Sequence, residues 1–130
     1  MIIESVTIPY YSQVLHVIFT KDADFDYKKI KKEFPKFSHK KKKLNFAATT
    51  MDIKHGNYLM VFNIKSISAI DHEAEIVNTI THETCHAINM IFKKIGIYLD
   101  EENDECQAYS SGWMAGEIYK IYLNFKTQEL

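Results

Sequence analysis

The sequence predicts an α+β fold, and three observations support this prediction. The first half of the chain contains two pairs of short segments rich in β-branched and aromatic residues, each pair separated by turn residues. From residue 71 onward, apolar residues recur every three or four positions over two long stretches. The 130 residues are 46% hydrophobic, enough to build one core. We therefore expect a single domain, residues 1–130, in which antiparallel strands and one helix precede two long helices.

Residues 2–8 and 14–20 predict the first pair of antiparallel strands, because both are rich in Ile and Val and a Pro-Tyr-Tyr-Ser turn separates them. Residues 24–34 predict a helix, which Pro35 ends. Several lysines of this helix are expected in solvent. The residues expected to face the core are Phe25, Ile30 and Phe34.

Residues 44–51 and 57–65 predict the second pair of strands, around a turn that contains Gly56. Just before this pair, residues 39–43 form one histidine followed by four lysines. This run is interpreted as a solvated loop, with an electrostatic docking patch for an acidic partner as the alternative.

Residues 71–95 predict a long amphipathic helix. Asp71 is a plausible N-cap, two lysines in the last turn complement the helix dipole, and Gly96 is a typical stop. Its apolar residues form a core stripe that leaves His82 and His86 along a different edge. The stripe consists of Ile76, Val77, Ile80, Ala87, Ile88, Ile91 and Ile95.

The pentapeptide His82-Glu83-Thr84-Cys85-His86 is the H-E-x-x-H pattern of zinc hydrolases, and it lies inside this helix. Side chains four positions apart share one face of a helix, about 6 Å apart along its axis, so both imidazoles can reach one Zn²⁺. Glu83 projects beside them and can accept a proton from a water molecule that the metal activates, then pass it to a leaving amine. The pattern therefore predicts that His82 and His86 bind zinc and that Glu83 is the catalytic base.

A catalytic zinc ion needs a third protein ligand. An acidic segment after Gly96 supplies candidates, and Asp100 is expected to cap a second helix that runs to about residue 125. Glu105 is the first candidate, because it is expected inside this helix. The alternatives, which are more simply first-turn residues, are Glu101, Glu102 and Asp104.

The second helix carries two further features. Small residues near one face, at positions 108, 112, 115 and 116, predict a close approach of the two long helices. Tyr109 follows Glu105 by one turn and is interpreted either as a core residue or as a catalytic residue whose hydroxyl stabilises an oxyanion.

These residues resemble those of the gluzincin group of zinc metallopeptidases, in which H-E-x-x-H is followed by a glutamate ligand on the next helix. The matching residues are His82, Glu83, His86 and Glu105. The chain is especially similar to small single-domain zincin-like proteins of bacteria and their phages, whose D-E-x-x-A-Y stretch corresponds here to residues 104–109. The resemblance covers about residues 57–120. It implies a zincin-like domain with an H-E-x-x-H helix and a C-terminal ligand-bearing helix.

The resemblance also implies an antiparallel edge strand that precedes the active helix and pairs with an extended substrate. Residues 58–64 are the candidates for that strand. All six histidines lie at or before position 86, so the all-histidine metzincin pattern is not expected.

We expect a zinc-dependent hydrolase, specifically a metallopeptidase acting on a peptide or protein. One alternative is a zincin-like structural or interaction protein, for example in a phage particle or prophage. Another is a regulatory or toxin-like module that acts on one protein partner. The intact Glu83 favours the enzyme over the structural protein, because a structural zinc site needs no base.

The composition bears on partners and location. A formal net charge of -1 gives no global attraction to nucleic acid or to acidic membranes. No stretch of about 18 apolar residues and no basic leader are seen, so we expect a cytoplasmic protein or, by the resemblance, a virion component. Cys85 and Cys106 are expected to be reduced packing residues, with a disulfide or thiolate ligation as alternatives.

Overall fold

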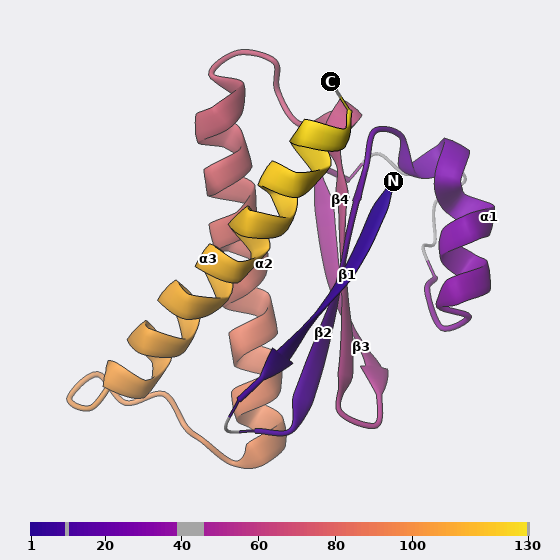
Figure 1. The fold of residues 1–130 in the computed structure, drawn as a ribbon. Helices are drawn as coiled ribbons and strands as arrows, with labels where there is room; N and C mark the ends of the chain where they lie inside the picture. Colours follow the sequence, from indigo (N-terminus) through magenta and orange to yellow (C-terminus); the bar gives the residue numbers. More distant parts are fainter. Residues whose placement is uncertain (10, 39–45, 130) are drawn as a thin grey trace.

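The computed structural model describes residues 1–9, 11–38 and 46–129, and it confirms the α+β class. The described residues form a four-stranded sheet and three α-helices (Figure 1). The elements are β1 (Ile2–Ile8), β2 (Gln13–Thr20), α1 (Ala23–Glu33), β3 (Ala48–Lys54), β4 (Asn57–Asn63), the short 3₁₀ helix η1 (Ile64–Ser66), α2 (His72–Ile95) and α3 (Glu105–Gln128). The basic run 39–43 and the expected start of the third strand at residue 44 lie outside the described residues.

The sheet has the strand order β1-β2-β4-β3. Both predicted pairs are antiparallel, and β2 and β4 join them by parallel pairing. The strand over residues 58–64 therefore does not lie at the edge as expected, because β4 is hydrogen-bonded to a neighbour on each side. The strand at that edge, beside α2, is β3.

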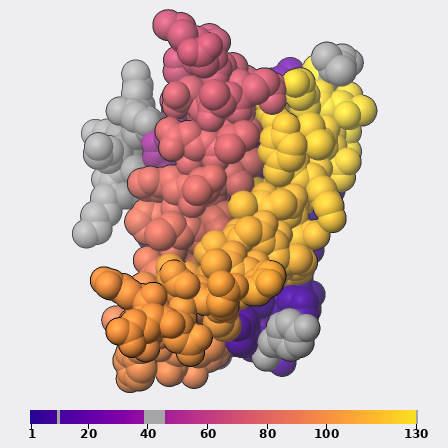
Figure 2. All heavy atoms as spheres, turned by 90° about the vertical axis from the view of Figure 1, so that its left-hand side faces the viewer, coloured from indigo at the N-terminus to yellow at the C-terminus, as the bar shows by residue number. Residues whose placement is uncertain are grey.

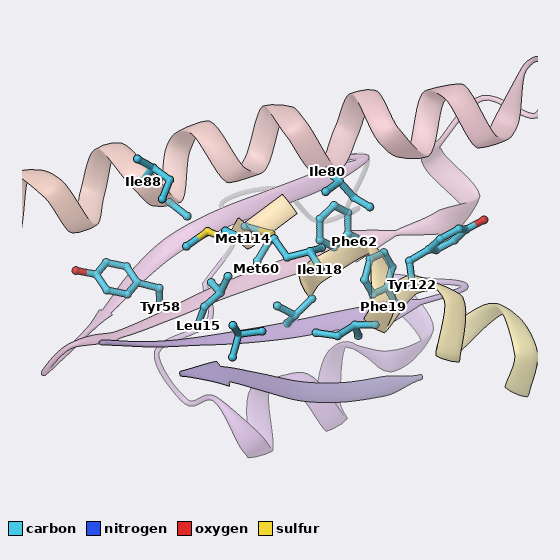
Figure 3. Packing of buried hydrophobic residues seen from close by; sticks show 14 of the residues in the cluster. Leu15, Phe19, Tyr58, Met60, Phe62, Ile80, Ile88, Met114, Ile118 and Tyr122 are labelled. Carbon is cyan, nitrogen blue, oxygen red and sulfur yellow. The ribbon is translucent and has the colours of Figure 1, made fainter. Parts of the chain in front are cut away.

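The alternation of side chains along β2 and β4 divides the core between the two faces of the sheet. Leu15, Val17 and Phe19 lie in the cluster that contains the buried hydrophobic residues of α2 and α3, whereas Ile18 lies in the cluster of α1. Figure 3 shows the larger cluster, in which side chains from α2 and α3 meet those of β2 and β4. The sheet is thus covered by α2 and α3 on one face and by α1 on the other (Figure 1). Phe25, expected in the core, is instead 82% exposed.

The helix ends follow the predictions only in part. Gly96 ends α2 in the left-handed conformation with φ of 79°, which glycine adopts without strain. Asp71 precedes α2, but its side chain makes no capping hydrogen bond. The second helix begins at Glu105 and not near Asp100, because the Asp100 carboxylate accepts a hydrogen bond from the backbone N–H of Glu102 at 3.0 Å. Such a bond stabilises a turn in place of a helical start.

Only Ala115 among the small residues of α3 packs against the core cluster that contains α2, whereas the two glycines do not lie at a close contact. A methyl group added at Gly112 or Gly116 would find no heavy atom within 4 Å outside its own helix. Larger side chains on another face of α3 enter the core instead. They are Met114, Ile118, Ile121, Tyr122 and Phe125. Among the described residues, no helix combines the length and the apolar character needed to cross a bilayer.

Glu73, in the first turn of α2, joins this helix to the end of α3. Its carboxylate accepts hydrogen bonds from Lys126 Nζ at 2.7 Å and from the Tyr122 hydroxyl at 3.1 Å. Lys126 holds the pKa of Glu73 below its ordinary value, and burial together with Glu73 raises the pKa of Tyr122 to about 12. The ionised form of Glu73 is therefore favoured in the folded protein.

We expect Glu73→Gln to lower stability at neutral pH by a small amount, since Glu73 is largely exposed. The folded pKa is depressed, so the contribution is present above the ordinary pKa of 4.5 and is lost as the pH falls through the folded value. Urea midpoints measured from about pH 7 down to about pH 3 should converge for wild type and variant. Glu75→Gln removes a carboxylate of the same first turn and is the control. A difference in urea midpoint that stays constant over this pH range would contradict the lowered pKa of Glu73.

Candidate metal centre

His82 and His86 lie one turn apart on α2, on its exposed side, as the spacing predicted. Their Nε2 atoms are 3.1 Å apart. Two nitrogen atoms that bind one tetrahedral zinc ion at about 2.0–2.1 Å would lie about 3.3 Å apart. The two imidazoles are therefore already arranged so that both nitrogens can reach one ion.

Glu83 points in a different direction, from the same turn of α2 toward β3. The side chain is buried, with 5% of its surface exposed, and it accepts a hydrogen bond from the Thr50 hydroxyl on β3. Its other carboxylate oxygen is 4.0 Å from His82 Nε2. The Thr50 bond leaves this second oxygen directed toward the histidines, where it can accept a proton or contact a cation.

His82, Glu83 and His86 form a group whose potential ligand atoms all lie within 4.8 Å of one another. Imidazole nitrogen and carboxylate oxygen are donors that divalent transition metals accept. The group can therefore hold a metal ion, and imidazole with carboxylate suits zinc among others.

A shallow cavity of about 250 Å³ adjoins this group, between α2 and the beginning of β3. Alanine methyl groups line it on one side and polar groups of α2 on the other. The lining residues are Ala47, Ala48, Asn78, Thr79, His82 and Glu83. The cavity offers room for a small group of a bound molecule directly beside the Glu83 carboxylate.

Glu105 and Tyr109 do not belong to the group. Glu105 is exposed at the first residue of α3, where its neighbours around a surface depression come from α3 itself. Tyr109 is 76% exposed and lies over the same depression. The alternative acidic residues Glu101, Glu102 and Asp104 are exposed as well. Glu105 as the third zinc ligand and Tyr109 as a catalytic residue therefore stay predictions.

Thr50 is the site residue that the sequence reasoning missed. A threonine on a predicted strand is unremarkable in sequence, because β-branched residues favour strands in any case. Its partner is 33 positions away, and only the packing of α2 over β3 brings the two together. The one feature of the sequence that could have pointed to Thr50 was its place on the strand pair that precedes the H-E-x-x-H helix.

Both cysteines are free and exposed. The Cys106 thiol lies 3.1 Å from the Tyr11 hydroxyl, and Cys85 contacts Asn89 on the outer side of α2. Free thiols agree with the expectation of reduced cysteines, whereas their exposure does not agree with the expectation of packing residues. Cys85 is not in the metal-binding group.

Comparisons with protein-family models, with curated proteins and with solved structures gave no match. The class of the protein is therefore defined by its fold and its site alone, without a family. The chain is a small α+β protein with a His-Glu-His group at metal-binding distance, compatible with the H-E-x-x-H motif.

Proposed function

We propose that this protein is a zinc-dependent hydrolase, and specifically a metallopeptidase of the gluzincin type. The observation that carries the proposal is the combination of two histidine nitrogens 3.1 Å apart with a buried carboxylate beside them. A purely structural site needs the two histidines but has no use for a base held in this position.

The residues of this site have separate roles in the proposed reaction. His82 and His86 would hold the zinc ion, which when bound supplies Lewis acidity that polarises a carbonyl group and acidifies water. Glu83 accepts the proton of the attacking water and transfers it to the leaving amine. Thr50 keeps the Glu83 side chain oriented, because its hydroxyl donates to the carboxylate oxygen other than the one that lies 4.0 Å from His82 Nε2.

The sheet edge beside the group suits an extended peptide. Among the described residues, β3 pairs with β4 alone and forms this edge of the sheet. The proposal places an extended peptide as a further strand on its other side. A peptide paired there would pass the cavity between α2 and β3, where Ala47 and Ala48 leave space for a small side chain. This arrangement supports a peptide over a sugar or phosphate ester as substrate.

One observation favours a second candidate function, a zincin-like interaction protein without general protease activity. Among the described residues, the group at metal-binding distance holds only one acidic residue, Glu83, and no further ligand. If Glu83 itself completes the metal site, it is no longer available as a base. Hydrolysis and metal binding must therefore be measured separately.

The test of the proposed activity is a digest of a broad peptide library by zinc-loaded protein, read by mass spectrometry. We expect cleavage that stops with a chelator and returns when zinc is restored. Absence of cleavage by protein that has been shown to contain zinc would favour the interaction protein.

We also propose Glu105 as the third ligand, as the resemblance implies. Because Glu105 lies outside the group in the structure, its binding requires the first turn of α3 to approach α2 when the metal binds. Glu105→Ala should then weaken zinc binding at least about tenfold in a competition titration. Glu101→Ala and Glu102→Ala are the controls and should have no effect. Unchanged affinity in Glu105→Ala would limit the ligands to His82, His86 and Glu83.

A further inference from the structure

A larger cavity, of about 480 Å³, lies beside the buried side of α2, away from the histidines. Ile88 follows His86 by two positions, which is about 200° around a helix, so the cavity and the metal-binding group use different faces of α2. The end of β1 and the turn after it, α2 and α3 form its walls. The lining residues are Ile8, Pro9, Tyr11, Ile88, Ile91, Tyr109, Ser110, Trp113 and Met114.

The lining contains no charged side chain. Its side-chain polar groups are three hydroxyls and the indole N–H of Trp113, and the Tyr11 hydroxyl lies 3.1 Å from Cys106 Sγ. The hydrogen bond with Cys106 and partial burial raise the pKa of Tyr11, so this hydroxyl stays protonated at neutral pH. The cavity thus presents largely apolar walls with a few neutral polar groups.

Two aromatic residues of α3 stand at the opening of the cavity. Tyr109 is 76% exposed and Trp113 is 38% exposed, although large aromatic side chains usually gain by burial. Both line the cavity, and their helix α3 lies beside α2 in the space-filling view of Figure 2. A ring bound in the cavity would cover part of the surface that these two side chains expose.

We propose that this cavity is a binding site for a neutral, largely apolar molecule with a flat ring system and one hydrogen-bonding group. The volume falls within the range of about 300–1,000 Å³ that is typical of small-molecule sites. Water would find few partners along these walls, and an anionic group would be desolvated without a cation to pair with. The site is independent of the metal-binding group, so this proposal does not rest on the proposed function.

Two dyes with the same ring system but different charge test this proposal. N-phenyl-1-naphthylamine is neutral, whereas 8-anilino-1-naphthalenesulfonate carries a sulfonate. In fluorescence titrations we expect saturable binding of the neutral dye, about one molecule per chain, at least about tenfold tighter than binding of the anionic dye. A chelator should not change the affinity. Failure of the neutral dye to saturate, or equal affinity for the anionic dye, would overturn the proposal.

Trp113 is the single tryptophan of the chain, so it locates the bound dye. With 5-fluorotryptophan incorporated, the one fluorine resonance should shift along the same saturation curve as the dye fluorescence. A resonance that stays in place while the dye saturates would place the binding elsewhere and overturn the proposal. This measurement needs no amino-acid substitution beyond the label.

Filling the cavity supplies the complementary test. Ser110→Phe on α3 and Ile91→Phe on α2 each add a ring to the cavity from a different helix, and each should weaken dye binding about tenfold or more. Asn124→Phe adds the same ring at an exposed position of α3 and is the matched control. Equal weakening by the control would overturn the assignment. If one filling variant fails to melt cooperatively, the other variant and the fluorine measurement decide.

Discussion

Replacing both His82 and His86 by alanine should abolish stoichiometric metal binding. Wild-type protein purified with zinc is expected to hold about one ion per chain by elemental analysis, and the double variant almost none. Loss of a partner that only supports a ligand typically costs about 10–100-fold in affinity, and removing two ligands must cost more. Each single variant should show an intermediate loss.

The control for this experiment is His72→Ala. His72 lies on the same helix, but its imidazole contacts the backbone carbonyl of Ser68 at 2.9 Å and is not in the metal-binding group. Thermal unfolding provides a second readout, because an ion that binds only the folded state raises the melting temperature. The rise on adding zinc should disappear in the double variant and persist in His72→Ala. Zinc retained by the double variant at the wild-type level would remove the basis of the proposed site.

Local patterns in the sequence were sufficient for the parts of the fold that depend on neighbouring residues. The 3.6-residue period located α2 to within one residue, and Gly96 located its end, because a left-handed residue is needed there. The i, i+4 spacing alone placed His82 and His86 on one face. Within one helix, spacing fixes geometry, and this is why the histidine pair was predictable.

Contacts between distant segments were not predictable in the same way. The hydrophobic pattern indicated strands but not their order. The apolar runs of β2 and β4 would look the same in sheets with different strand orders. The position of β3 beside α2, and with it the Thr50 contact to Glu83, follows from that order. Gly112 and Gly116 of α3 were expected at a close helix contact, yet larger side chains of α3 bury more apolar surface and determine the packing.

The buried position of Glu83 makes one substitution especially informative. Glu83→Gln keeps the size of the side chain and an oxygen that can accept the Thr50 hydrogen bond, but it removes the basic carboxylate. We therefore expect zinc content and melting temperature close to those of the wild type. Hydrolysis of a peptide identified in the library digest should fall by about 10²–10⁴ in rate, the usual contribution of a general base.

Measuring zinc content and rate on the same preparations separates the two roles that the geometry permits for Glu83. If Glu83 is a base, the rate collapses while zinc remains; if Glu83 is instead a metal ligand, its replacement by glutamine lowers the zinc affinity as well. Glu75→Gln, on the same helix but outside the metal-binding group, controls for the loss of one negative charge and should keep both the zinc and the rate. Cleavage that persists in Glu83→Gln at the wild-type rate would assign the proton transfer to another group or the activity to a contaminant. Loss of zinc from this variant would show that the carboxylate lying 4.0 Å from His82 Nε2 completes the metal site.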